Sequence, residues 1–173
     1  AEARDSAVFP VLMENPFYRR AFEKPRGYAG DAVTMDFVYD EGDTSAALDA
    51  ATPTGRRLWR VDRLIRSIRA ACERTALAAA MIDRACALRS APLIVSVGAG
   101  HARELAKVSA LGRKAIGALH VVDQDRKSLD RIRRDYGDEV ELICHEVSVE
   151  TLIRRNLVEA ADLVYCLGVY DYL

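Results

Sequence analysis

Glycines and an acidic residue follow two apolar runs of this chain, in the pattern of a ligand-binding site. Gly98, Ala99 and Gly100 come directly after the run at 93–97, and Asp123 ends the run at 115–122. Glycines let a ligand approach the backbone, and the helix expected to follow at 101–110 would add unpaired N–H groups and a partial positive charge. An acidic side chain at the next strand end can accept hydrogen bonds from both ribose hydroxyls. The pattern predicts a nucleoside site.

Two details of this pattern bear on the kind of nucleoside. Asp123 could instead cap the following helix, although Asp125 could fill that role. A dinucleotide fingerprint places a third glycine where this chain has Arg103, a large charged residue. The sequence therefore disfavours NAD and favours a ligand without a pyrophosphate.

The C-terminal half must position these residues, and its apolar runs alternate with helical patterns. Strands are predicted at 93–97, 115–122, 140–144 and 163–167, with helices at 101–110, 127–136 and 149–160. This alternation predicts a doubly wound, Rossmann-like α/β fold with a parallel sheet covered on both faces and the first strand at the switch point. We expect a cofactor-binding domain at 90–173.

The N-terminal half reads as a helical cap and lead-in helix at 1–89. Asn15, Asp31 and Thr52 are predicted helix caps, before helical segments at 16–22, 32–39 and a long helix from Pro53. A further short helix is expected at 45–51. The apolar stripe of the long helix would comprise Leu58, Val61, Leu64, Ile65, Ile68 and Cys72.

Composition narrows the class of protein further. With 173 residues, 50% of them hydrophobic, the chain can bury a core, and 25 basic against 26 acidic residues give a net charge of −1. This balance supports neither a nucleic-acid nor a membrane surface, and a row of arginines on the long helix reads as a solvated face. The four cysteines are expected to be reduced thiols of a cytoplasmic protein, and no metal site is predicted, because neither the cysteines nor the three histidines have metal-ligand spacing.

The strand-end motifs resemble those of the class I S-adenosylmethionine-dependent methyltransferases. The resemblance covers residues 92–173 and rests on Val-Ser-Val-Gly-Ala-Gly (95–100), Val-Val-Asp (121–123), Ile-Cys-His-Glu-Val (143–147) and Asp-Leu-Val-Tyr-Cys-Leu-Gly (162–168). It implies S-adenosylmethionine as cofactor, with the glycine turn on its amino-acid part, Asp123 on its ribose and the residues after the third strand on its adenine. The implied cofactor-binding set is Gly98, Ala99, Gly100, Asp123, Gln124, Glu146, Val147 and Leu167. Two departures are Ser96, where the family often has an acidic residue, and Ala102, where it has a glycine.

The N-terminal half resembles one bacterial subfamily, described as 3-hydroxy fatty acid methyl ester synthase-like. The segments concerned are Lys-Pro-Arg-Gly-Tyr-Ala-Gly-Asp (24–31) and Thr-Pro-Thr-Gly-Arg (52–56). This resemblance implies that the Tyr28 loop folds over the cofactor pocket; a surface turn with a packed tyrosine is the alternative. Tyr28, Asp31 and Tyr170 are then the candidate catalytic residues, and no general base is assigned among them.

The resemblance implies a methyltransferase acting on a small molecule such as a carboxylate, which needs no general base because it is ionised at neutral pH. Two alternatives stay open. The same cofactor could be used without methyl transfer, for example in a ring closure that releases methylthioadenosine, or the chain could be an inactive cofactor- or partner-binding module. We also expect self-association, or a further C-terminal segment, to cover the fourth strand, since it would otherwise be an exposed edge.

Overall fold

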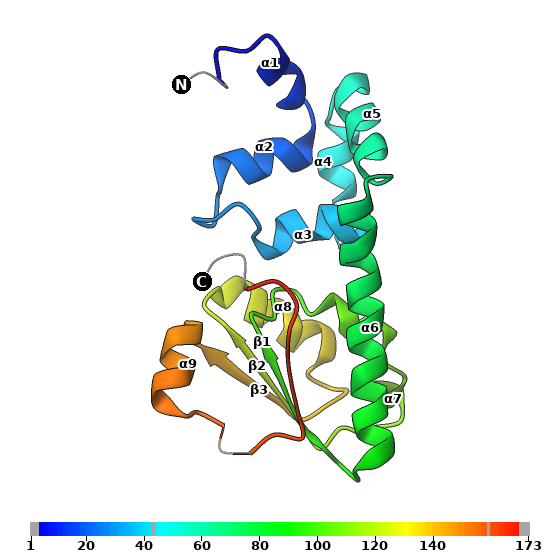
Figure 1. Cartoon of the computed structure of the whole chain (residues 1–173), viewed down its shortest axis with the longest axis vertical. Helices are drawn as coiled ribbons and strands as arrows, with labels where there is room; N and C mark the ends of the chain where they lie inside the picture. Colours follow the sequence, from blue (N-terminus) through cyan, green and yellow to red (C-terminus); the bar gives the residue numbers. More distant parts are fainter. Residues whose placement is uncertain (1–3, 43, 159, 170–173) are drawn as a thin grey trace. The chain divides into compact units, whose positions relative to one another are not determined.

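The computed structural model describes residues 4–42, 44–158 and 160–169, and its C-terminal half is built around four strands. These are β1 (Leu93–Val97), β2 (Ala118–Asp123), β3 (Leu142–Glu146) and β4 (Leu163–Cys166). All pairs are parallel, and the strand order is β3-β2-β1-β4 (Figure 1). The predicted α/β class is confirmed, and the order reverses at β1, as the switch-point prediction requires.

The sheet register places alternate residues of the strands on one buried face. Ile94 pairs with Leu119, and Ser96 lies between Val121 on β2 and Tyr165 on β4. Helices α6 (Arg66–Leu88), α7 (Ser109–Gly112) and α8 (Arg126–Tyr136), with the 3₁₀ helix η1 (Arg103–Lys107), supply the apolar residues that pack on this face. Helix α9 (Val149–Arg155) contacts β2 and lies on the other side of the sheet from α6 (Figure 1). Helices therefore lie on both faces of the sheet.

The prediction of one helix at 101–110 is wrong. Ala102 has a left-handed φ of 49°, its N–H donates to the Ala99 carbonyl, and only the single 3₁₀ turn of η1 follows before the chain extends at Val108. The carboxylate of Asp83, on α6, then accepts hydrogen bonds from the Ser109 and Ala110 N–H groups and starts α7. A second, separate helix therefore begins at Ser109 because a side chain of another helix caps it. The local sequence does not reveal such a cap.

Other bounds in the second half differ in smaller ways. β2 begins at Ala118, because Gly117 and Ala118 both donate to the Pro92 carbonyl and hold the chain beside β1. β3 begins and ends two residues later than predicted. α9 ends at Arg155 rather than at 160, since Asn156 adopts a left-handed φ of 44° and closes the helix.

The first half is helical, as predicted. Its elements are α1 (Val8–Leu12), α2 (Pro16–Glu23), α3 (Ala32–Tyr39), α4 (Ser45–Asp49) and α5 (Pro53–Asp62). The predicted caps are confirmed: side chains of Asn15, Asp31 and Thr52 accept hydrogen bonds from the first turns of α2, α3 and α5. The chain divides into two compact units, Ala1–Glu73 and Arg74–Leu173, with the boundary inside α6, and the division expected after residue 89 stays a prediction.

The prediction of one long helix from Pro53 is also wrong, because two helices, α5 and α6, stand in its place. α5 ends at Asp62, and the N–H groups of Leu64 and Ile65 make tight bonds to carbonyls three residues back before α6 begins. Much of the predicted apolar stripe is exposed, with Val61 at 59% and Leu64 at 76%. The buried side of α5 is instead the side that carries Asp62. This carboxylate accepts hydrogen bonds from the Asn15 amide (2.7 Å) and the Tyr18 hydroxyl (2.8 Å). Burial and this carboxylate raise the pKa of Tyr18 to about 12.

Gly55 gives a test of how closely α5 packs on the chain before α2. A Cβ at Gly55 would collide with the carbonyl of Glu14, although Gly55 is helical. Gly55→Ala should therefore lower the free energy of unfolding by about 1–3 kcal/mol, even though alanine is the better helix former. Gly112, the last residue of α7, has no atom near its Cβ position, so Gly112→Ala is the matched control. Urea unfolding followed by circular dichroism measures both; equal effects would contradict this packing.

A histidine pair between β2 and β3 predicts a pH dependence of stability. His120 Nδ1 and His145 Nε2 lie 2.9 Å apart, and the rings stack. Burial lowers the pKa of both, with Glu141 partly opposing the shift at His120 and the His120 ring adding to it at His145. The unfolded chain therefore binds more protons below pH of about 6.5.

Stability from this pair should be present above that pH and be lost as the pH falls toward the lowered folded-state values. Thermal melts between pH 8 and 5 should show a steeper fall of the melting temperature for the native chain than for His120→Gln. The glutamine side chain at position 120 cannot titrate. Parallel melting curves for the native chain and His120→Gln would contradict the role of the pair.

Candidate functional site

The glycine turn after β1 is bound to the end of β2 by its own backbone. The N–H groups of Gly98 and Ala99 both donate to the Val122 carbonyl, at 2.8 and 3.1 Å. Gly98 and Gly100 have φ values of 63° and 55°, which favour glycine. A Cβ at Gly98 would also collide with the Val169 side chain, which follows β4. The turn is thus enclosed by the ends of β2 and β4, at the switch point of the sheet.

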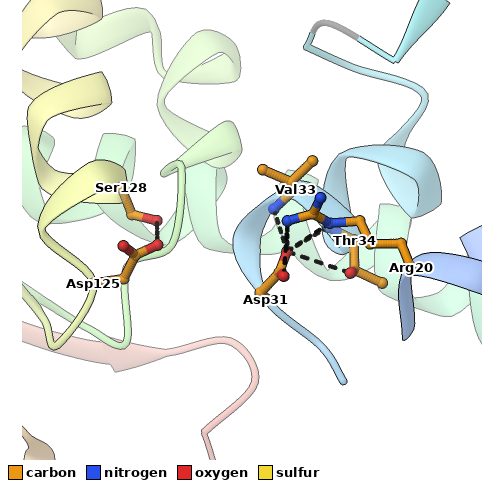
Figure 2. A network of polar contacts seen from close by, with 6 residues as sticks. All are labelled: Arg20, Asp31, Val33, Thr34, Asp125 and Ser128. Atoms are coloured by element: carbon orange, nitrogen blue, oxygen red, sulfur yellow. Dashed lines mark hydrogen bonds and ion pairs between the residues drawn. The ribbon is translucent and has the colours of Figure 1, made fainter. Parts of the chain in front are cut away.

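Asp123 makes the third connection between these turns. Its Oδ2 accepts from the Gly100 N–H at 2.8 Å and its Oδ1 from the Asp125 N–H at 2.8 Å. The side chain is buried, and burial raises its pKa, although the two backbone hydrogen bonds and His101 pull the pKa down. Each carboxylate oxygen has room for a second donor. The alternative role of helix cap belongs to Asp125, which accepts from the Lys127 N–H and the Ser128 hydroxyl (Figure 2).

These bonds correct one premise of the sequence interpretation. The three N–H groups of the turn already have acceptors in the protein, and no α-helix begins after it. A phosphate would need those donors and that helix N-terminus. The site instead presents the Asp123 carboxylate, which can accept hydrogen bonds from hydroxyl groups. The backbone of the turn at 98–100 presents a surface against which a ligand could pack.

The other expected cofactor-binding residues lie at neighbouring strand ends. Glu146 pairs with Asp123 in the sheet register and is exposed, and Gln124 is also exposed. Val147 is half-buried after β3. Leu167, after β4, is half-buried and packs against the hydrophobic core, as does Ala99. The fold therefore gathers this whole set at the C-terminal edge of one sheet.

Two of the three candidate catalytic residues, Tyr28 and Asp31, belong to the first unit. Asp31 is fully buried, and its carboxylate caps α3 while pairing with Arg20 at 2.8 Å (Figure 2). That carboxylate is committed to the fold of the first unit and is not free to act on a substrate in this conformation. Tyr28 is half-buried in the same unit, so its approach to the pocket stays a prediction. Tyr170 lies outside the described residues.

Sequence reasoning missed a buried polar cluster behind the glycine turn. The Tyr165 hydroxyl, on β4, donates to Glu104 Oε1 on η1 at 2.7 Å, and Ser96 on β1 is the neighbour of Tyr165 in the sheet register. Glu104 is only 3% exposed, and burial together with this carboxylate raises the pKa of Tyr165. Ser96 therefore lies beside a buried carboxylate supplied from elsewhere in the chain. A charged residue in the middle of the apolar pattern at 102–106 was the available signal.

Several kinds of site find no support among the described residues. No group of three histidine, cysteine or acidic side chains is placed to hold a metal ion there. Cys72, Cys86, Cys144 and Cys166 are half-buried, and none of the four is in a disulfide within the described part of the chain. In the same part of the chain, no helix has the length and apolar character needed to cross a membrane.

Comparisons with known proteins do not add a family to this description. Searches against models of protein families, against curated proteins and against solved structures each found no significant match. The chain is therefore characterised by its fold and site alone: an α/β protein with a parallel four-stranded sheet and an acidic residue bonded to a glycine turn at the switch point.

The hydrogen bonds of Asp123 predict a large effect of its removal on stability. Asp123→Ala leaves the Gly100 and Asp125 N–H groups without their acceptor and should cost about 3 kcal/mol in the free energy of unfolding. Asp125→Ala removes only a helix cap and should cost about 1 kcal/mol. Urea unfolding followed by circular dichroism measures both. An equal, small loss in the two variants would show that Asp123 does not hold the turns together.

Proposed function

We propose that this protein is an S-adenosylmethionine-dependent methyltransferase acting on a small molecule such as a carboxylate. The observation that carries the proposal is the position of Asp123, at the end of β2 and hydrogen-bonded to the glycine turn of β1. In open parallel sheets, ligands bind outside the carboxyl ends of the strands at the switch point. A carboxylate at that place fits the two hydroxyls of a ribose.

The state of the glycine turn supports a nucleoside without a pyrophosphate. Its backbone donors are already used within the protein, and Arg103, which stands at the third glycine position of a dinucleotide fingerprint, is buried. A bulky side chain there prevents the close helix–strand packing that the fingerprint requires. S-adenosylmethionine carries a ribose and no phosphate, so it does not need a phosphate-binding turn.

The residues of the site fit this cofactor in the following way. Asp123 would accept hydrogen bonds from the ribose hydroxyls, Glu146 and Val147 would border the adenine, and the turn at 98–100 would face the amino-acid part. When bound, S-adenosylmethionine supplies a methyl group on a sulfonium, which is displaced in line by a nucleophile. The chain's task is then to align the acceptor and exclude water. A carboxylate acceptor is ionised at neutral pH, so its methylation needs no proton transfer and no general base.

Isothermal titration calorimetry tests the cofactor. We expect S-adenosylmethionine and S-adenosylhomocysteine to bind, and Glu146→Ala to weaken binding by about tenfold, the loss of about 1.4 kcal/mol. Glu146 is exposed, so this variant should keep its fold. Asp138→Ala is the matched control, because Asp138 is an exposed acid before β3, away from the strand ends that carry Asp123. Binding of NADH without binding of S-adenosylmethionine would overturn the proposal.

Mass spectrometry of the spent cofactor tests the reaction. S-adenosylhomocysteine as product, formed only with an acceptor present, indicates methyl transfer. Methylthioadenosine would instead indicate attack at the amino-acid side of the sulfonium, the alternative use of the same site. Cofactor binding with neither product, across a panel of small carboxylates, would favour a binding module without activity.

A further inference from the structure

Helix α6 is apolar on two opposite sides over its last four turns. One side packs into the core of the second unit through Ala78, Ala79 and Ile82. The other side is exposed and comprises Ala76, Leu77, Ala80, Met81, Arg84, Ala87 and Leu88. Leu77 is 62% exposed, Met81 43% and Leu88 73%. A surface helix normally has one apolar side, which faces its core, so a second, exposed side with three large apolar residues has the character of an interface.

The spacing on this side fits another helix. Leu77, Met81, Arg84 and Leu88 recur at intervals of four, three and four residues, which places them along one line of the helix. Ala76, Ala80 and Ala87 run beside that line and leave shallow places next to the larger side chains. One turn before Leu77 lies Glu73, also exposed. The line thus carries an acid at one end, a base toward the other, and apolar residues between them.

We propose that α6 pairs antiparallel with α6 of a second copy of this chain, about a twofold axis between residues 78 and 79. In this register Leu77 packs over Ala80 of the partner subunit, and Met81 packs over Ala76 of the partner subunit. Arg84 then lies opposite Glu73 of the partner subunit. By symmetry each contact occurs twice, so large residues fill the places left by alanines on both helices.

Charge selects this occupant and this orientation. A parallel pair would place Arg84 opposite the same residue of the partner, and like charges facing each other are destabilising. The antiparallel pair replaces that repulsion with two ion pairs at the ends of the apolar segment. Figure 1 shows α6 on the opposite side of the sheet from α9, and the exposure of Leu77, Met81 and Leu88 leaves this side of α6 uncovered within the second unit.

The size of the surface sets the expected affinity. One helix pair buries less than the roughly 1,200–2,000 Å² of a stable standard interface. The dimer should therefore form with a Kd on the order of micromolar and depend on protein concentration. The inference does not depend on the proposed function, because no residue of the strand-end site takes part.

Sedimentation velocity over a range of about 1–200 µM tests the pairing. The native chain should shift from monomer to dimer across that range. Glu73→Arg and Arg84→Glu should each raise the Kd by about tenfold or more, and the double variant Glu73→Arg/Arg84→Glu should restore it, because the ion pairs reform with reversed charge. Leu77→Glu should abolish the dimer. Circular dichroism should show the same helix content for all variants, since each changed side chain is exposed.

Ile153→Glu is the control, because Ile153 is 74% exposed on α9 and lies outside the proposed face. It should leave the dimer unchanged. A native chain that stays monomeric over the whole range would overturn the proposal. A dimer that persists in Leu77→Glu would place the contact elsewhere and overturn it too. Single charge swaps that weaken the dimer without rescue by the double variant would exclude the antiparallel register.

Discussion

The second unit depends on a small set of hydrogen bonds that tie two strand ends together. The Asp123 carboxylate accepts hydrogen bonds from the Gly100 and Asp125 N–H groups. The Val122 carbonyl accepts from the N–H groups of Gly98 and Ala99, the other two residues of the turn. Without these acceptors the half-buried N–H groups of the turn would lose their partners in the protein, which is costly. The same bonds fix the direction in which the chain leaves β1. The position of η1, and of Glu104 under Tyr165, follows from that direction.

This arrangement ties folding and the proposed binding to one carboxylate. Burial disfavours the charge on Asp123 and raises its pKa, while the backbone donors of the turn that it holds favour the charge and oppose that shift. A ligand with hydroxyl groups can share the carboxylate because each oxygen accepts more than one hydrogen bond. A ligand that required the backbone donors would have to break the turn. In the proposed function, the turn therefore favours ligands that donate hydroxyl hydrogens over ligands that need its backbone donors.

Local signals made much of the fold predictable. β1 is bounded by Pro92 and Gly98 and was predicted without error, and the caps Asn15, Asp31, Thr52 and Asp125 act within two or three residues of their own position. The two largest errors have long-range causes. Asp83 starts α7 from another helix, and Asp62 ends α5 in contact with Asn15. Helical periodicity cannot register such contacts, since they depend on which elements meet.

The site divides in the same way. Its placement at the strand ends could be predicted, because parallel strands bring their carboxyl ends to one edge. What could not be predicted is how its donors and acceptors are paired, since a chain pattern shows an acid and a glycine but not the bond between them. Asp31 is an example. The sequence analysis gave it as a candidate catalytic residue, and in the structure its carboxylate is paired with Arg20 inside the first unit. For a polar residue, the partners it already has determine the chemistry left to it.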